Sequence, residues 1–174
     1  MSEEVKGMKR DTSMMADISI AYFNMDSVMA NWDLYFDYQQ KLQKKQSEME
    51  TEFAGRTERY YQSVQDAQYK VQRGLVTRSE AEQLQQQLAN EEQTLMNLQN
   101  QFTSQLQEEG LVKNRKLLDM IERYVRELSE QNGYAYVYSY SFGGNLIYGA
   151  EPYDITSEVV RGLNQRFKPG MDID

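Results

Sequence analysis

The fold is decided where one sequence period gives way to another, in ISIAYFNMDSV at residues 18–28. Ile18, Ile20 and Tyr22 recur at every second position, which is typical of a β-strand with one apolar face. The residues that follow offer side-chain acceptors for the free N–H groups of a helix start, and helical spacing begins at once. The stretch therefore predicts a strand that leads directly into a helix beginning near Ser27.

A single apolar stripe runs along the helix that follows. Its members recur at the intervals of a heptad seam and are Val28, Trp32, Tyr35, Leu42, Met49, Phe53, Tyr60, Val64, Ala67 and Val71. Such a stripe packs against a partner helix. Polar residues stand at Lys45 or Gln46 and at Arg56, where apolar residues would complete the seam. We therefore expect uneven packing along this helix.

The helical period stops at residues 73–77 and then resumes. Thr77 and Glu80 have the spacing of a capping box, which opens a second helix. The second stripe comprises Leu84, Leu88, Leu95, Leu98, Phe102, Leu117, Ile121, Tyr124 and Leu128. Two matched stripes joined by a short turn predict an antiparallel helical hairpin. At a rise of about 1.5 Å per residue, helices of about 45 residues would extend roughly 65 Å.

The chain returns to a strand-like pattern after the Asn-Gly pair at residues 132–133, which is typical of a helix end. Tyrosines alternate along residues 134–140, and a glycine-containing turn separates them from NLIY at 145–148. This arrangement predicts a β-hairpin. Thr156 is the expected cap of a short amphipathic helix at 157–167.

Strand patterns on both sides of the helical hairpin mean that the first strand joins the later two only after a long excursion. We therefore expect an α+β fold, with a long, coiled-coil-like antiparallel helical hairpin inserted in a small three-stranded antiparallel sheet body that also has a short C-terminal helix. The expected parts are a flexible lead-in (1–16), a β body (17–26 and 132–167), a helical-hairpin arm (27–131) with its tip near 73–79, and a tail (168–174).

A three-stranded sheet with one short helix has a small core, so other subunits would have to cover the rest of its apolar face. We expect the β body to hold an oligomer together. The candidate residues of this oligomer body are Ile18, Ile20, Tyr22, Tyr136, Tyr138, Leu146, Tyr148, Val159 and Leu163.

The outer half of the arm carries the candidate contacts with an unfolded polypeptide. They are Tyr60, Tyr61, Tyr69, Leu75 and Val76. Aromatic rings offer broad contact area at little cost in entropy, although packing on the partner helix is the alternative for each residue. Lys70, Arg73 and Arg78 gather near the same tip. They would either touch a membrane or an acidic client, or simply hydrate the surface.

The composition excludes several classes of function. The chain has no cysteine and no histidine, and its net charge is -8. Thiol and imidazole chemistry and a general attraction to nucleic acid are therefore not expected. The pairs Glu91-Glu92 and Glu108-Glu109 are adjacent on a helix, so their side chains diverge by about 100° and suit a hydrated surface better than a metal site. We expect no enzyme, no cofactor, no metal and no membrane-spanning helix.

Two segments that bracket this pattern resemble one known family. IAYFNMDSV at residues 20–28 resembles the opening strand-to-helix segment of the Skp (OmpH-like) family of periplasmic chaperones, and DITSEVVRGLN at 154–164 resembles its closing segment. The resemblance covers about residues 18–167. It implies a homotrimer whose β bodies associate and whose arms enclose unfolded outer-membrane or envelope proteins without ATP. It also implies export to the periplasm, with the signal sequence absent here, or a lipid-anchored mature form.

The charge of the chain departs from this family. Familiar members are basic, and their positive arms are thought to draw in clients and anionic lipid, whereas this chain is acidic. Client capture would then depend on apolar contact and enclosure. The alternative function is a structural or adaptor protein whose arms bind one defined partner, although a gapped seam suits a specific coiled coil less well. A prefoldin-like chaperone fits poorly because its chain ends form the arm.

Overall fold

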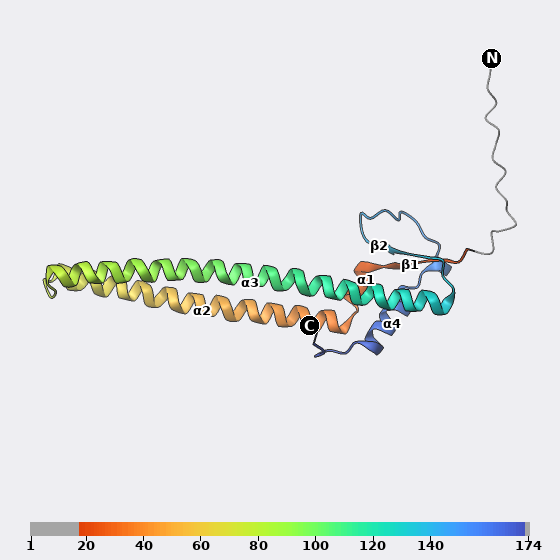
Figure 1. The fold of residues 1–174 in the computed structure, drawn as a ribbon, viewed down its shortest axis with the longest axis horizontal. Coiled ribbons are helices and arrows are strands. Elements are labelled where there is room, and N and C mark those ends of the chain that lie inside the picture. The colour runs from red at the N-terminus through yellow and green to blue at the C-terminus, as the bar shows by residue number, and fades with distance from the viewer. Residues whose placement is uncertain (1–17, 173–174) are drawn as a thin grey trace, which may run out of the picture. The chain divides into compact units, whose positions relative to one another are not determined.

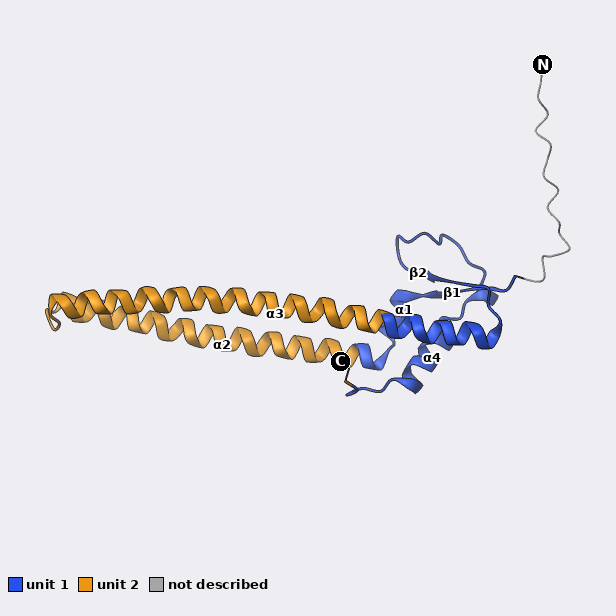
Figure 2. Cartoon of the chain, in the orientation of Figure 1, with its two compact units in different colours: residues 1–35, 119–171 blue, residues 36–118, 172–174 orange. Residues whose placement is uncertain are grey.

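The structure is a computed structural model that describes residues 18–172 and divides into two compact units (Figure 2). The units are the body, residues 18–35 and 119–171, and the arm, residues 36–118 together with Asp172. The lead-in expected at 1–16 lies outside the described residues, as do the last two residues of the tail expected at 168–174.

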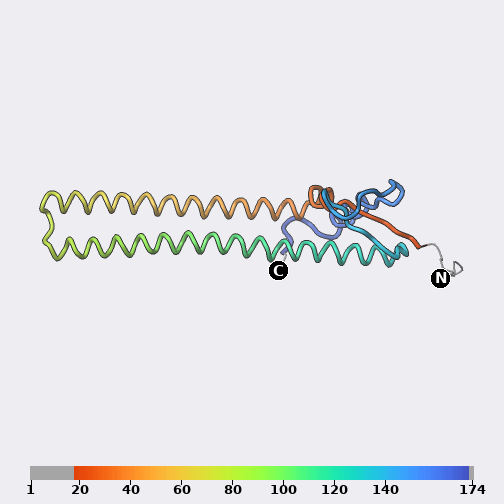
Figure 3. Tube along the Cα trace, turned by 90° about the horizontal axis from the view of Figure 1, so that it is seen from above, coloured from red at the N-terminus to blue at the C-terminus, as the bar shows by residue number. Residues whose placement is uncertain are grey.

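Helices make up most of the chain (Figure 1). In chain order the elements are β1 (Ile20–Asn24), α1 (Met25–Ala30), α2 (Asp33–Gln72), α3 (Arg78–Asn132), β2 (Tyr136–Tyr140), the 3-10 helix η2 (Glu151–Tyr153) and α4 (Thr156–Arg166). Within the arm, α2 and α3 run side by side in opposite directions, as Figures 1 and 3 both show. The predicted helical hairpin is therefore present.

The reversal at the arm tip follows from the residues that form it. Gly74 has a φ of 65°, a left-handed conformation that favours glycine, and Leu75 N donates to Lys70 O at 2.9 Å. Thr77 N donates to Glu80 Oε2 at 2.6 Å, and Glu80 N donates to Thr77 Oγ1 at 3.3 Å. These reciprocal bonds confirm the predicted capping box.

The seam of the arm is mostly half-buried, because two helices shield each other on one side only. At the first expected gap, Lys45 of α2 forms an ion pair with Glu109 of α3. At the second, Arg56 is exposed and pairs with Glu52 of its own helix at 2.7 Å. Thr57, which is half-buried, takes the seam position next to it. The packing is uneven, with polar groups at two levels of the seam.

Two helix starts in the body differ from the sequence prediction. α1 begins at Met25, because the side chain of Asn24 accepts from Ser27 N at 2.8 Å and so caps the helix earlier than expected. Thr156 is the first residue of α4 and not its cap: Asp154 Oδ1 accepts from Thr156 N at 2.8 Å. The Thr156 hydroxyl binds β1 instead, where it accepts from Asn24 N at 2.9 Å.

The predicted first helix is interrupted between α1 and α2, where Trp32 is buried. Asn164 of α4 bridges this break. Its Nδ2 donates to Asn31 O at 2.8 Å, and its Oδ1 accepts from Asp33 N at 2.9 Å. The interruption therefore depends on an amide far along the chain, which a local period does not reveal.

The prediction of a three-stranded antiparallel sheet is wrong. The sheet has two strands, β1 and β2, which run parallel, with Ile20 opposite Tyr136. Parallel strands need a long crossover, which the arm supplies. The direction follows from the helix lengths, 55 residues in α3 against 40 in α2. The longer returning helix brings the chain to the start of β1, where Ala135 N donates to Ser19 O at 2.8 Å.

The expected third strand at residues 145–148 is not formed. The loop that contains it is held to β1 and α1 by two hydrogen bonds. Asp26 Oδ2 accepts from Phe142 N at 2.9 Å, and Tyr22 Oη donates to Gly149 O at 3.0 Å. Because these bonds tie both ends of the segment to residues at or beside β1, it does not fold back along β2 as a hairpin.

The core lies mainly in the body. Its buried apolar residues there are Ala21, Phe23, Val28, Trp32, Leu34, Ile121, Val125, Leu128, Ile155, Val159 and Leu163. α4 packs on α1 and on β1. An ion pair between Arg166 of α4 and Glu127 of α3 adds a further link within this unit. The body thus closes one face of its sheet with helices.

Candidate binding surfaces

One face of the two-stranded sheet is covered and the other is open. Successive strand residues point to opposite sides, and paired residues of parallel strands point to the same side. Ala21 and Phe23 are buried in the core, whereas Ile20, Tyr136 and Tyr138 on the opposite face are exposed. The open side, which we call the sheet face, comprises Ile20, Tyr22, Tyr136 and Tyr138, and Ile18, which precedes β1, is exposed as well. The two exposed tyrosine rings stack with centroids 6.5 Å apart.

Tyr22 differs from its neighbours on the sheet face because it is half-buried. Its ring lies against Gly149, where an added Cβ would come within 2.2 Å of ring carbon Cε1. Desolvation raises the pKa of the Tyr22 phenol, and the carboxylate of Asp154 raises it further. Tyr22 thereby anchors the loop that follows β2, and only glycine fits beneath its ring.

This loop adds apolar side chains that the sequence candidates left out. Phe142 is 96% exposed and Ile147 is 90% exposed, and Tyr153 is also exposed. Of the candidates from the sequence, Tyr148 is exposed and Leu146 is half-buried. Several large apolar residues in a glycine-containing loop indicate an interaction surface, because a loop that faces only water seldom carries them.

Val159 and Leu163 occupy a different place from the other candidates of the oligomer body. Both are fully buried on α4, within the core of a single protomer. They support the body from inside and line no surface.

The outer edge of β2 is unpaired, since β1 is its sole strand partner within residues 18–172. An unpaired edge presents N–H and C=O groups to another strand. A two-stranded sheet is also marginally stable by itself. The sheet face, the loop and this edge together form a surface chemically suited to a further polypeptide chain.

Tyr60, the first of the five candidate contacts on the arm, is half-buried beside Leu95 and Leu98. Desolvation raises the pKa of its phenol, and the carboxylate of Glu92 raises it further. The ring of the neighbouring Tyr61 lies 5.9 Å away between centroids and is exposed. Tyr60 therefore takes part in the seam, whereas Tyr61 faces water.

The other three candidates lie nearer the tip. Tyr69 and Leu75 are exposed, and Val76 is half-buried. The Arg73 guanidinium carbon lies 5.6 Å from the centroid of the Tyr69 ring, within the range of a cation–π contact. The structure thus leaves Tyr61, Tyr69 and Leu75 open to a partner but does not gather them into one cluster.

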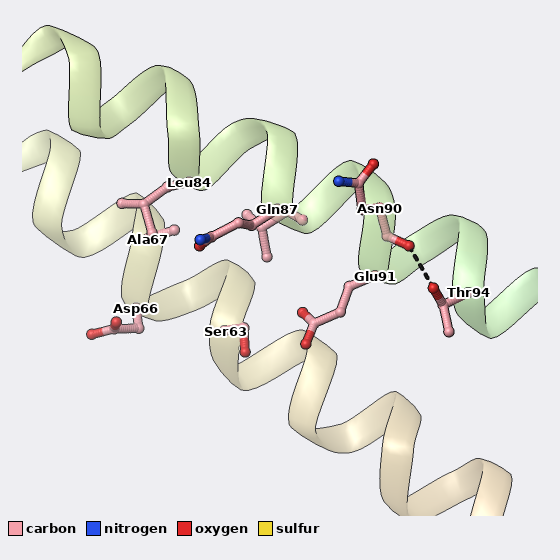
Figure 4. Close-up of a pocket in the computed structure, with 9 residues that line it drawn as sticks. Ser63, Asp66, Ala67, Leu84, Gln87, Asn90, Glu91 and Thr94 are labelled. Atoms are coloured by element: carbon pink, nitrogen blue, oxygen red, sulfur yellow. Dashed lines mark hydrogen bonds between the residues drawn. The ribbon is translucent and has the colours of Figure 1, made fainter.

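The basic character expected at the tip is largely neutralised. Lys70 pairs with Asp66 at 2.6 Å, and Arg78 pairs with Glu82 at 3.2 Å. Below the tip, an open groove of about 500 Å³ runs beside the small residue Ala67 (Figure 4). Its lining is mostly polar or acidic and comprises Ser63, Asp66, Ala67, Leu84, Gln87, Leu88, Asn90, Glu91 and Thr94. The cations near the tip are therefore close in sequence but do not form a basic ligand site.

The described residues contain no group of three or more acidic side chains that could hold a metal ion. In the same part of the chain, no helix is both long and apolar enough to cross a bilayer. Of the adjacent glutamates, Glu109 forms an ion pair with Lys45, and Glu91 lines the groove below the tip beside Ala67.

Comparison with known proteins identifies one family. The family model described as Outer membrane protein (OmpH-like) matches residues 19–163, which include both β1 and most of α4. A search of curated proteins returned no match.

Proposed function

The chain belongs to the OmpH-like family, and on that premise we propose that it is an ATP-independent periplasmic holdase that shields unfolded outer-membrane or envelope proteins. The family is associated with chaperoning outer membrane proteins. A holdase works by covering apolar surface and needs no reacting group. The exposed Tyr61, Tyr69 and Leu75 on the arm suit that role, because they can contact varied clients with little ordering.

We place the self-association of the protein at the body. The observation that supports it best is the open sheet face beside an unpaired β2 edge, with Phe142 and Ile147 nearly fully exposed next to it. Apolar side chains at this density mark an interaction site. A homotrimer joined at this surface would carry three arms in one assembly.

The holding function is tested by diluting a urea-unfolded outer-membrane β-barrel into buffer and following light scattering. Suppressed aggregation at stoichiometric trimer, without ATP, is the expected result. No suppression at large excess, or a pull-down that returns a single stoichiometric partner, would instead support an adaptor whose arms pair with one protein.

Self-association is tested by the mass of the protein in solution. The wild type should have about three times the 20.5 kDa mass of one chain, and the double variant Tyr136→Ser with Tyr138→Ser should approach the single-chain mass. A matched control removes two equally exposed tyrosines from the arm, Tyr61→Ser with Tyr69→Ser, and should leave the mass unchanged. A wild-type monomer at micromolar concentration would rule out the cage.

A further inference from the structure

One asparagine of the chain is followed by glycine. It is Asn132, at the end of α3, whereas the other eight asparagines precede larger residues. In an Asn-Gly pair the backbone nitrogen of the glycine can close a ring on the side-chain carbonyl of the asparagine, and the absence of a Cβ on Gly133 lets the two atoms approach. The pair is therefore a candidate for a covalent change that needs no enzyme.

The surroundings of this pair favour such a reaction. Asn132 is the last residue of α3, and both Asn132 and Gly133 are exposed. Gly133 has a φ of 73°, and a Cβ added there would meet no atom within 4 Å beyond its chain neighbours. Within residues 18–172, Tyr134 N donates to Ser129 O at 3.0 Å, but Gly133 N donates to no backbone oxygen. Water can therefore reach Gly133 N and take its proton.

A single hydrogen bond holds the Asn132 side chain in the folded state. Its Nδ2 donates to Leu128 O at 2.9 Å, one turn back along α3. That bond keeps the amide against the helix, whereas ring closure needs Asn132 Cγ to reach Gly133 N. Because the last turn of a helix frays readily, one such bond delays the reaction and does not prevent it. The rate at Asn132 should therefore follow the opening of the end of α3.

We propose that Asn132 is a site of spontaneous deamidation that limits the lifetime of the folded body. Gly133 N loses its proton to hydroxide, and its lone pair forms a bond to Asn132 Cγ. The bond from Cγ to Nδ2 then breaks, and the nitrogen leaves as ammonia after taking up a proton from water. Water adds to either carbonyl of the resulting cyclic imide, and the ring opens to aspartate or to isoaspartate. The reaction needs water alone and does not depend on the proposed holdase function.

Both products alter the junction between α3 and β2. Each adds a negative charge at the C-terminal end of α3, where the backbone carbonyls already make the end negative and no basic residue lies in the last turn. Isoaspartate also carries the main chain through the side-chain carbon, which lengthens it by one atom. Only residues 133–135 separate α3 from β2, and Ala135 N donates to Ser19 O at 2.8 Å. The longer chain would therefore disturb the register of β2 against β1.

The test incubates the folded chain at pH 8 and follows its peptides by mass spectrometry, with aspartate and isoaspartate separated by chromatography. Asn132 should convert before any other asparagine, including Asn145, which is exposed in a loop but precedes Leu146. Denaturant should accelerate the conversion only about two- to tenfold, since one neutral hydrogen bond opposes it in the folded chain. Asn132→Gln should show no conversion over the same period, because glutamine would have to close a larger ring.

The effect on the body is followed by the fluorescence of Trp32, which is buried in that unit. Aged wild type should melt at a lower temperature than fresh protein, and the melting temperature of Asn132→Gln should not change with age. Asn132→Asp, which makes one product directly, should also melt earlier. A matched charge control, Asn97→Asp, places the same charge at an exposed position within α3 and should leave the Trp32 transition unchanged.

Conversion at Asn132 no faster than at Asn145 would overturn the site. Acceleration by denaturant of about a hundredfold or more would overturn it too, since the folded helix end would then protect the amide far beyond one hydrogen bond. Conversion that leaves the Trp32 transition unchanged would overturn the effect on the body. An equal loss of stability on ageing in Asn132→Gln would do the same, because the loss would then come from another position.

Discussion

The body and the arm bury their apolar residues in opposite ways. The body contains eleven of the buried apolar side chains, whereas the longer arm contains three, Tyr38, Ala67 and Leu117. The body is also tied by bonds between distant residues, such as Asn24 N to Thr156 Oγ1. The arm depends on half-buried contacts between two helices and on ion pairs four residues apart.

This difference in packing fits the function proposed for each unit, which is self-association for the body and client contact for the arm. Ion pairs such as Arg56 with Glu52 and Lys70 with Asp66 contribute only about 0.3–0.5 kcal/mol each on an exposed helix. An arm stabilised by many weak interactions can bend or fray locally while the rest of the chain stays folded. A body with a closed core keeps the sheet face and the β2 edge in one arrangement for association.

The largest expected effect comes from removing a core side chain of the body. Leu163 is fully buried, so Leu163→Ala should lower the free energy of unfolding by about 3–5 kcal/mol. Leu95, on the seam of the arm, is half-buried, and Leu95→Ala should cost only about 1–2 kcal/mol, because less of the side chain leaves an apolar environment. Urea unfolding of both variants checks the difference.

Two signals report the units separately. Trp32 is the one tryptophan of the chain and is buried in the body, so its fluorescence follows that unit. Ellipticity at 222 nm is dominated by α2 and α3. Leu163→Ala should shift the fluorescence transition more than the ellipticity transition. Equal shifts of both signals by both leucine variants would mean that the body and the arm unfold as one cooperative unit.

An intermediate effect, with opposite signs in the two units, is expected from glycines inside helices. Alanine normally stabilises a helix interior by about 0.5–1 kcal/mol relative to glycine. Gly55 in α2 has open space around it, so Gly55→Ala should raise the melting temperature. Gly162 in α4 lies against Tyr124, and an added Cβ would fall 1.6 Å from the Tyr124 hydroxyl oxygen. Gly162→Ala should therefore destabilise the body by about 1–3 kcal/mol.

The mechanism is checked by combining Gly162→Ala with Tyr124→Ala, which removes the ring that the new methyl group would meet. The double variant should be no less stable than Tyr124→Ala alone. A Gly162→Ala protein as stable as the wild type would show that the Tyr124 ring moves aside at no cost. In that case α4 would be less tightly packed than the core of the body suggests.

The arm could be predicted from the sequence because its determinants are local. The apolar stripe from Leu42 to Ala67, the turn at Gly74 and the capping box of Thr77 and Glu80 each depend on residues within a few positions of one another. The prediction failed in the arm at two places. At Arg56 the error was one residue, since Thr57 holds the seam position and Arg56 faces water, and Val71, expected in the seam, is 51% exposed.

The sheet could not be predicted in the same way, because its order depends on distant residues. The alternation of apolar and polar residues identified β1 and β2 but does not reveal whether the two strands run parallel or antiparallel. That direction depends on the unequal lengths of α2 and α3. The segment at 145–148 has the composition of a strand, yet its flanking residues are held by Asp26 and Tyr22. The basic segment of α3 at residues 110–118 was missed because a charge total over the second helix averages it with acidic neighbours.

The smallest expected effect is a pH dependence that again separates the units. Hydrogen bonds from Arg166 hold the pKa of Glu127 in the body below its usual value, and hydrogen bonds from Thr77 do the same for Glu80 at the arm tip. A carboxyl group with a lowered pKa in the folded state adds stability above its unfolded pKa, about 4.3, and that contribution disappears as the pH falls through the folded value.

Glu127→Gln should therefore lower the melting temperature followed by Trp32 fluorescence at pH 6 and have a smaller effect at acidic pH, because the wild-type carboxyl takes up a proton as the pH falls through its folded-state pKa. Glu80→Gln should leave that signal unchanged at either pH and slightly lower the ellipticity transition at pH 6, because its bonds lie in the arm. Both shifts should be small, since these side chains are exposed and water screens their charges. A Glu80→Gln variant that shifts the Trp32 transition as much as Glu127→Gln would show that the tip and the core of the body are coupled through the long helices. The two units would then differ in their packing but not in their stability.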